Sequence, residues 1–163
     1  MVKDHSLPWL GLSLLIVVLD QITKVLATKH LIYLQAKPLF PGLNLTLVHN
    51  TGAAFSFLSE AGGWQRWFFI ALTIGVSIAL VYWLATLSRK RRWLAVALAL
   101  VLGGALGNLW DRITMGYVID FIDVYYGTMH WPAFNVADSA ISVGAVMLVI
   151  DAIWFDQAEV STK

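Results

Sequence analysis

The sequence has no cysteine and few charged residues. None of its 163 residues is cysteine, which excludes disulfides, thiolate nucleophiles and cysteine metal ligands. Lys, Arg, Asp and Glu make up only 13% of the chain, whereas a soluble domain carries roughly 25%. The net charge is +1, so the chain lacks the electrostatic field that attracts nucleic acid. We therefore expect no nucleic-acid partner.

What the sequence does contain is apolar surface. Hydrophobic residues make up 59% of the chain and the mean hydropathy is +0.73. This surplus needs a solvent other than water, and the phospholipid bilayer supplies one. Eight Trp, five Tyr and eight Phe suit the membrane–water interfaces, where an aromatic ring with a polar edge lies at headgroup depth. The composition therefore predicts an integral membrane protein.

Four segments are long and apolar enough to cross a bilayer as α-helices, which takes about 20 residues. They lie at about residues 8–27, 67–87, 93–110 and 136–155. The first could instead be a cleavable signal, but no small-x-small cleavage site follows it, and Asp20 and Lys24 interrupt it. We therefore expect four retained transmembrane helices in a single integral membrane domain, residues 1–163.

The charges between the spans indicate an orientation. Residues 88–92, between the second and third spans, contain four cations, and dense Lys and Arg in a short loop mark the cytoplasmic side. With an even number of spans both termini then lie in the cytoplasm, where Lys3 and Lys163 agree. The segments at about residues 28–66 and 111–135 are then expected at the outer face.

The first outer segment contains a strand pattern. In "LNLTLVHN", residues 43–50, leucines alternate with Asn44 and Thr46, and a period of two is typical of a strand. Thr51 and Gly52 follow as the expected turn. The predicted fold class is therefore an all-α membrane protein with a small β element, in which an amphipathic β-sheet and loop platform lies on the outer face.

Polar residues in or near the spans form one layer toward the outer face. Such residues are rare in membrane segments, face the interior of the bundle and mark functional sites. The layer consists of Asp20, Lys24, Asn108, Asp111, Arg112, Asp120, Asn135 and Asp138. Asp151 lies near the cytoplasmic end of the fourth span, outside this layer, and we expect it to be structural.

Two pairs in this layer have a structural interpretation. Asp20 and Lys24 are spaced i, i+4 and can neutralise each other on one helix face. Asp111 and Arg112 can form a pair at the interface, with the arginine reaching toward the headgroups. A direct role in binding or chemistry is the alternative for both pairs.

Asp138 has both a structural and a chemical interpretation. Asn135 can cap the fourth span with Asp138 at position N3, near the positive end of the helix dipole. Asp120, however, lies between Ile119 and Phe121, where a lone carboxylate would be costly. If Asp138 lies opposite, the two can share one proton, because two close like charges cannot both ionise. One would activate a water and the other would polarise an amide carbonyl, as in an aspartic peptidase.

Asp123 is the other candidate partner for Asp138. In a helix Asp120 and Asp123 would share a face, and in a strand they would point to opposite sides. The residue pattern alone does not separate the two.

Two other function classes compete with a peptidase. A proton- or ion-coupled transporter would use Asp20, Asp120 and Asp138 as a relay, but a relay should cross the bilayer and this layer is confined to one face. The sequence also lacks the internal repeat common in transporters. A structural subunit with only paired charges would leave Asp120 without an evident partner. His49 and His130 are isolated and lack metal-ligand spacing, so we expect neither a metal nor a cofactor.

Five motifs in order resemble those of one known family. They are "LDQITK", "NTGAAFSF", "GGALGNLWDR", "VIDF" and "FNVADS". Their order, spacing and four-span layout, over nearly the whole chain, resemble lipoprotein signal peptidase (signal peptidase II), an aspartic peptidase of the bacterial inner membrane. The resemblance implies that Asp120 and Asp138 are catalytic and so prefers Asp120 to Asp123. The substrate-binding or supporting residues that it implies are Asp20, Lys24, Asn50, Gly52, Asn108, Asp111, Arg112, Asn135 and Ala137.

The resemblance also implies a substrate and a location. The enzyme would cleave the signal peptide from a diacylglyceryl-modified prolipoprotein just before the lipidated cysteine. Its active site would lie near the periplasmic face of the inner (cytoplasmic) membrane, and globomycin-type cyclic peptide inhibitors would occupy it. A loop near residues 55–66, with Gly62 and Gly63, is a hypothetical lid over the site.

Overall fold

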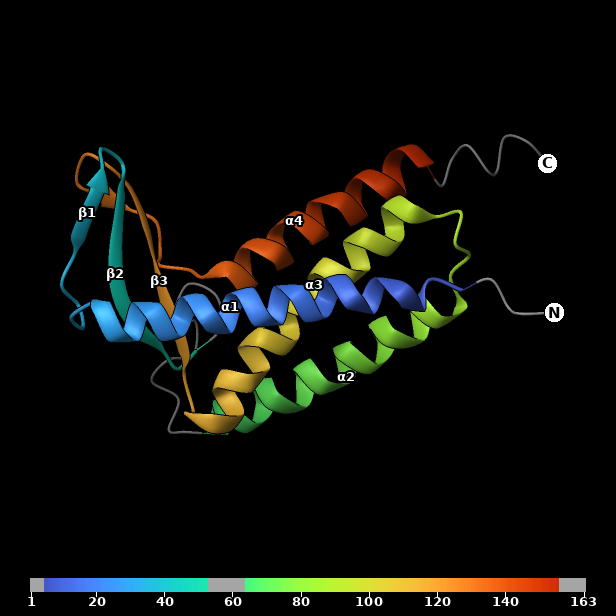
Figure 1. Cartoon of the computed structure of the whole chain (residues 1–163), viewed down its shortest axis with the longest axis horizontal. Coiled ribbons are helices and arrows are strands. Elements are labelled where there is room, and N and C mark those ends of the chain that lie inside the picture. The colour runs from blue at the N-terminus through green and yellow to red at the C-terminus, as the bar shows by residue number, and fades with distance from the viewer. Residues whose placement is uncertain (1–4, 53–63, 156–163) are drawn as a thin grey trace.

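The computed structural model describes residues 5–52 and 64–155. Within them, long helices form a bundle and short strands form a sheet across one end of it (Figure 1). The elements are α1 Leu10–His30, β1 Lys37–Phe40, β2 Leu43–Asn50, α2 Trp64–Thr86, α3 Arg92–Thr114, β3 Val118–Tyr126, β4 Met129–His130 and α4 Val136–Ile150. This arrangement confirms the predicted fold class. The hypothetical lid lies outside the described residues, except for residues 64–66, which begin α2.

Each of these helices is long and apolar enough to cross a membrane. With the short helical turns that precede α1 and follow α4, the candidate spans are Leu7–His30, Trp64–Thr86, Arg92–Thr114 and Val136–Trp154. Pro8 lies in the first turn, where its missing N–H would have no helical partner in any case. Helix α3 runs a turn past the predicted limit at residue 110 and so includes Asp111, whose charge is neutralised by Lys24 inside the bundle. The chain is therefore a multi-span membrane protein.

Helix α3 is the central element of the bundle. About 67% of its most apolar window is buried, against 22% for each of the other helices. Small residues let its neighbours approach closely, as membrane helices favour. A side chain at Gly103 would meet Ser13 and Ile16 of α1, and one at Gly104 would meet the backbone of Ala137 in α4. Helices α1 and α4 thus pack directly against the backbone of α3.

The strands form one antiparallel sheet in the order β1-β2-β3-β4. Strand β2 confirms the strand predicted at residues 43–50, whereas β1 and β4 were not predicted. Tight turns join the hairpins at Gly42, with φ +90°, and at Gly127, with φ +60°. Glycine adopts these left-handed conformations without the steric cost of a Cβ, so the two glycines allow the chain to reverse.

The alternation in β2 does not separate an apolar face from a polar one as simply as predicted. Leu47 is buried in a cluster with Ala27, Ile119 and Phe121, where the sheet packs against the end of α1. Asn44, however, is also buried. Its amide donates a hydrogen bond to the buried carboxylate of Asp123 on the neighbouring strand β3, which compensates for its burial. The leucine side of β2 therefore packs as predicted, and the opposite side carries a buried polar contact.

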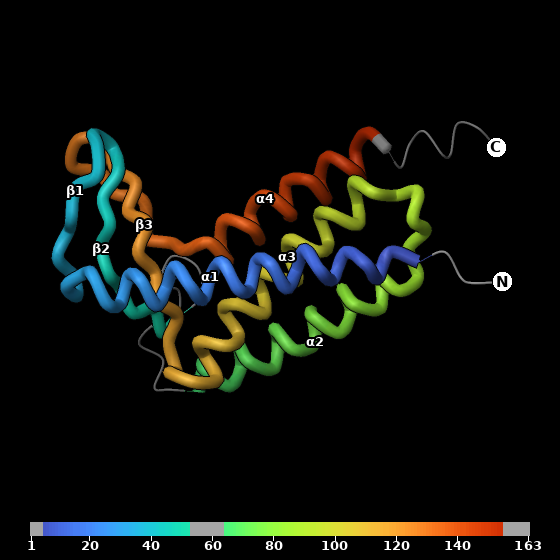
Figure 2. Tube along the Cα trace, viewed as in Figure 1, coloured from blue at the N-terminus to red at the C-terminus, as the bar shows by residue number. Residues whose placement is uncertain are grey.

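The sheet and the described ends of the chain lie at opposite ends of the bundle. In Figure 2 the three longer strands lie at one end of the bundle, around the last turns of α1, whereas α1 begins and α4 ends at the other end, near the α2–α3 connection. The polar layer lies toward the sheet end, because β3 and the first turn of α4 meet there. This end of the molecule therefore holds the candidate site.

Candidate active site

Asp120 and Asp138 come from β3 and from the first turn of α4. After β4 the chain returns to β3, where the Phe134 N–H donates to the Ile122 carbonyl at 3.1 Å and the Ile122 N–H donates to the Phe134 carbonyl at 2.8 Å. This pairing ends one residue before the cap of α4, so it sets the start of the helix beside β3. The two carboxylates are brought to the same place by backbone hydrogen bonds.

Asn135 connects the two aspartates directly. Its side-chain Oδ1 accepts from the Asp138 N–H at 2.8 Å, while its Nδ2 donates to Asp120 Oδ1 at 2.7 Å. The Asn135 N–H in turn donates to Asp138 Oδ2 at 3.3 Å, which completes a capping box. The capping interpretation of Asp138 is therefore confirmed. The same fully buried asparagine also holds the second carboxylate.

Two further amides complete the contacts of the carboxylates. Asn108 of α3 donates from Nδ2 to Asp138 Oδ1 at 2.7 Å, and Asn50 at the end of β2 donates from Nδ2 to Asp120 Oδ2 at 3.1 Å. Neutral amides rather than cations thus hold both carboxylates. Among the described residues, no salt bridge cancels the negative charges of the two carboxylates.

Asp120 is in an environment that favours its protonated form. It is only 2% exposed. Burial is the main cause and the negative charge of Asp138 a further one, and together they raise the pKa of Asp120 to about 7 despite the hydrogen bonds from Asn50 and Asn135. Near neutral pH the two aspartates can therefore share a single proton, with one acting as an acid and the other as a base.

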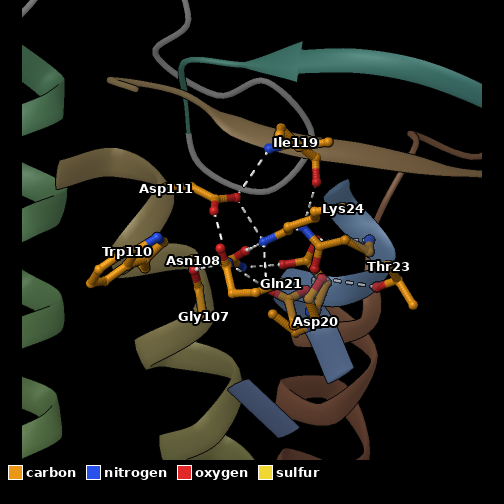
Figure 3. Close-up of polar contacts among 12 residues, drawn as sticks. Asp20, Gln21, Thr23, Lys24, Gly107, Asn108, Trp110, Asp111 and Ile119 are labelled. Atoms are coloured by element: carbon orange, nitrogen blue, oxygen red, sulfur yellow. Dashed lines mark hydrogen bonds and ion pairs between the residues drawn. The ribbon is translucent and has the colours of Figure 1, made fainter. Parts of the chain in front are cut away.

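A buried ion-pair cluster lies beside the two aspartates. Lys24 Nζ lies 2.7 Å from Asp20 Oδ2 and 2.8 Å from Asp111 Oδ2, and it donates to Asn108 Oδ1 at 2.9 Å (Figure 3). An ammonium has three donors, so all three are used. The predicted Asp20–Lys24 pair is confirmed. The predicted pairing of Asp111 with Arg112 is wrong, because helix packing places Lys24 of α1 against Asp111.

The ion-pair cluster also fixes the segments that carry the aspartates. Asp20 Oδ1 accepts from the Ala137 N–H at 2.9 Å, next to Asp138, and Asp111 Oδ2 accepts from the Ile119 N–H at 3.3 Å, next to Asp120. Each backbone contact lies one residue from an aspartate. Charges on α1 and α3 therefore set the positions of β3 and α4.

Gln21 belongs to this cluster, and the sequence analysis missed it. Its Nε2 donates to Asp111 Oδ1 at 2.9 Å and lies 3.2 Å from Asp20 Oδ2 and 3.3 Å from the Gly107 carbonyl. A side chain at Gly107 would come within 2.7 Å of Asp20 Oδ2, so glycine at this position leaves room for the Asp20 carboxylate beside Gln21. The available signal was the position of Gln21 inside the "LDQITK" motif.

Arg112 fastens the end of β2 over the site. Its guanidinium donates to the Gly52 carbonyl at 2.9 Å and lies 5.2 Å from the centre of the Phe69 ring. The Gly52 N–H donates to Asn50 Oδ1 at 3.0 Å, so the chain bends at Gly52, within the predicted turn. Arg66 of α2, also missed from sequence, donates to the Arg112 carbonyl at 2.9 Å and so ties α2 to the same end of α3.

Asp123 points away from Asp138, because β3 is a strand. Its carboxylate accepts from Asn44 at 3.3 Å and from Thr46 at 3.0 Å, and it lies 2.8 Å from His130 Nδ1. Burial would raise the pKa of Asp123, but these hydrogen bonds outweigh burial and lower it. Asp123 is therefore an ordinary ionised carboxylate on the other side of the sheet. Among the described residues no three or more potential ligands gather into a metal site.

Known proteins resemble this chain over most of its length. The family description "signal peptidase II" matches residues 12–154. The lipoprotein signal peptidase of Acinetobacter baumannii is 59% identical over 153 residues, which cover 94% of this chain and 87% of that protein. The lipoprotein signal peptidase of Teredinibacter turnerae is 54% identical over 149 residues, 91% of this chain and 89% of that protein.

Solved structures of a bacterial membrane enzyme share the fold. One superimposes with a TM-score of 0.84 at 33% identity, over 98% of this chain and 95% of the solved chain. A second gives a TM-score of 0.80 at 33% identity, over 94% of this chain and 98% of the solved chain. Because the coverage is nearly complete, the likeness includes both the helix bundle and the sheet.

Proposed function

The chain belongs to the signal peptidase II family, and from this premise we propose that it cleaves the signal peptide from diacylglyceryl-modified prolipoproteins, just before the lipidated cysteine. Family membership makes the protein a peptidase, that is, an enzyme that hydrolyses peptide bonds. Its helices hold this enzyme in a membrane. The relatives' name, lipoprotein signal peptidase, supports the substrate class.

Asp120 and Asp138 are the proposed catalytic pair. The observation that carries this proposal is that two carboxylates from different elements, Asp120 buried and Asp138 half-buried, are both bound by Asn135. Asp120, with a pKa raised to about 7 by burial and by the charge of Asp138, suits a pair that holds one proton at neutral pH. Asp123, with a lowered pKa and its own hydrogen bonds, does not.

The proposed reaction is hydrolysis by an activated water. The ionised carboxylate takes a proton from a water whose oxygen bonds to the carbonyl carbon, while the protonated carboxyl donates its proton to the carbonyl oxygen. The tetrahedral intermediate then breaks its C–N bond as the amide nitrogen gains the proton that the first carboxylate took from water, and a hydroxyl of the intermediate returns a proton to the other carboxylate. The products are the carboxyl end of the signal peptide and the free amine of the lipidated cysteine.

The other site residues act as supports in this proposal. Lys24 fixes Asn108 by occupying its Oδ1, so the amide nitrogen of Asn108 must face Asp138. Asp20 and Asp111 hold the adjacent backbone at Ala137 and Ile119. The remaining supports, which hold the end of β2 and the cap of α4, are Asn50, Gly52, Arg112 and Asn135.

The proposed location is the bacterial inner membrane, with the sheet end at the periplasmic face and both termini in the cytoplasm. The cations of residues 88–92 at the opposite end of the bundle support this orientation. The signal helix would lie among the spans and the acyl chains in lipid, so the scissile bond reaches the dyad near the membrane–water boundary. Globomycin-type cyclic peptides are expected to compete for this position.

The transporter alternative is not favoured. It required Asp20 as a member of a relay with Asp120 and Asp138, but Asp20 is paired with Lys24 at 2.7 Å and bound to the backbone of α4. The family match is to a peptidase. A scaffold with only paired charges would also leave unexplained why Asp120 and Asp138 are held by amides.

A cleavage assay tests the proposed dyad. Purified protein in nanodiscs would be given a diacylglyceryl-modified prolipoprotein without added metal, and release of the signal peptide would be followed on a gel. We expect Asp120→Asn and Asp138→Asn each to lower the rate by roughly 10²- to 10⁴-fold, because each removes one partner of the acid–base pair.

Asp123→Asn is the matched control, since it makes the same chemical change on the same strand. It should keep cleavage within a few-fold of the unsubstituted protein. All variants are to be compared for folding by their elution and thermal unfolding. An inactive unsubstituted protein, or asparagine variants of Asp120 and Asp138 that still cleave, would falsify the proposal.

A further inference from the structure

Two cavities lie along the contact between α1 and α3. One, of about 400 Å³, is lined by apolar side chains of α1, α2 and α3 that include Leu14, Val17 and Leu106. The other, of about 340 Å³, is nearer the sheet and is lined among others by Val25 and Thr28. The first lies wholly among membrane-spanning helices, where the surrounding medium is lipid, whereas the second is also lined by His49 of β2 and Ile119 of β3.

The two cavities are successive parts of one groove. Their linings on α1 follow one helix face at steps of three or four residues, through Leu14, Val17, Gln21, Val25 and Thr28. Trp110 of α3 lines both. The lining on α1 extends from Leu10 to Lys29, which at about 1.5 Å per residue is close to 30 Å of helix. We call this feature the α1–α3 groove.

The polarity of the α1–α3 groove changes along its length. At the end away from the sheet its polar side chain is Ser13, whose hydroxyl already donates to the Ala99 carbonyl. At the sheet end its lining includes Lys29 and His49. Lys29 is exposed, whereas the carboxylate in the same lining, Asp111, is already paired with Lys24. The exposed cation at the sheet end of the groove suits a phosphate headgroup, and the apolar remainder of the groove suits an acyl chain, so the groove matches a lipid that carries both.

We propose that the α1–α3 groove binds one bilayer glycerophospholipid, with its phosphate at Lys29 and His49 and an acyl chain along Val17 and Leu14. This lipid is separate from the substrate, because neither Asp120 nor Asp138 is among the described residues that line the groove.

The bound lipid has a structural consequence for the ion-pair cluster. Lys24, Asp111 and Gln21 form the floor of the groove at its sheet end. The Lys24–Asp111 contact of 2.8 Å is itself already buried. A bound lipid would therefore cover the exposed neighbours of the cluster on α1, Val25 and Thr28, and add packing on its outer side.

Native mass spectrometry of the purified protein tests the proposal, with phosphatidylglycerol and diacylglycerol offered separately as probes. We expect one phosphatidylglycerol to remain bound. Val17→Trp fills the apolar part of the groove and should lower this retention at least tenfold. Val18→Trp is its control, because Val18 is 43% exposed to lipid and lies outside the described lining.

Lys29→Gln tests the headgroup contact and does not disturb the packed helix face. It should weaken retention of phosphatidylglycerol several-fold and leave that of diacylglycerol, which has no phosphate, unchanged. Lys37→Gln, an exposed cation on β1, is the matched control for a general loss of charge. Loss of retention in both lysine variants alike, or unchanged retention in both Val17→Trp and Lys29→Gln, would overturn the proposal. Because Lys29 is exposed, its variant keeps the proposal testable even if Val17→Trp fails to fold.

Discussion

The four aspartates that gather at the candidate site are of two kinds, and their partners distinguish them. Asp20 and Asp111 share the ammonium of Lys24, so their charges are cancelled inside the bundle. Asp120 and Asp138 are held by amide groups instead. A carboxylate that accepts hydrogen bonds from neutral amides is oriented, but no positive charge offsets the free-energy cost of burying its negative charge. A proton shared between two such carboxylates lowers this cost. The first kind is suited to structure and the second to proton transfer.

Replacing Asp120 by asparagine should change the dependence of stability on pH. The pKa of Asp120 is raised from 3.8 to about 7, chiefly by burial, so between these values the folded protein binds more protons than the unfolded chain. Its stability therefore falls as pH rises through this window. Asp120→Asn removes that loss, so its melting temperature relative to the unsubstituted protein should increase by a few degrees between pH 4 and about 7, then level off. Scanning fluorimetry in detergent measures this difference.

Asp123→Asn provides a control of opposite sign on the same strand. Because hydrogen bonds outweigh burial and lower the pKa of Asp123, its charged form stabilises the fold above the unfolded value and this contribution is lost as pH falls. The variant should therefore melt below the unsubstituted protein near neutral pH, and the gap should close in acid. Parallel curves for the Asp120 and Asp123 variants would contradict the assignment.

At the scale of elements, close packing against α3 decides where α4 begins. The backbone of Ala137 lies against Gly104, and the next residue along α4 is Asp138. Strand β3 contributes in another way, because its alternation turns Asp120 toward α4 and Asp123 toward β4. Arg66 adds a third constraint, since it binds the Arg112 and Ile113 carbonyls at the end of α3. The site is therefore sensitive to small shifts between elements.

Gly104→Ala should lower both activity and stability. A methyl group there would collide with the Ala137 carbonyl and lie 2.7 Å from Ile141 Cγ1, which forces α4 away from α3. Overpacking of this kind costs about 1–3 kcal/mol, and the displaced helix start carries Asp138. We expect cleavage to fall at least tenfold in the prolipoprotein assay.

Gly75→Ala is the matched control for Gly104→Ala in another span. Nothing lies within 4 Å of the added methyl group, and alanine is the better helix former by roughly 0.5–1 kcal/mol. Its activity should be unchanged and its melting temperature equal or slightly higher. Equal loss of activity in the two variants would show that close packing at Gly104 is not the cause.

At the scale of the whole molecule, the sheet and the α2–α3 connection lie at opposite ends of the bundle. A membrane across the four helices therefore separates these two ends. The proposed dyad lies at the sheet end, where a substrate approaching from the bilayer would meet both lipid and water. Helix α3, the most buried of the four, connects the two ends.

Cysteine labelling can test the proposed orientation directly, because the chain contains no cysteine of its own. Single substitutions would be made at Tyr126, which is 90% exposed at the end of β3, and at Lys90, exposed between α2 and α3. In intact cells with a permeable outer membrane, an impermeant maleimide should label Tyr126→Cys and not Lys90→Cys. Labelling of both after the inner membrane is opened is the control, and the reverse pattern in intact cells would invert the topology.

The sequence by itself determined the features that depend on local composition and period. Long apolar runs predicted four spans, because a helix must satisfy its backbone within one segment to cross lipid. Alternation predicted β2, and the i, i+4 spacing predicted the Asp20–Lys24 pair. The five motifs also indicated the family to which the chain belongs.

The tertiary structure decided the features that depend on which segments meet. Asp111 pairs with Lys24 rather than with its neighbour Arg112, because the partner is set by the packing of α1 on α3. Asp120 and Asp123 differ because pairing with β2 makes their segment a strand, a choice that its own residues left open. A hydrogen bond or ion pair between distant segments depends on the relative position of two backbones, and no single stretch of sequence carries that information.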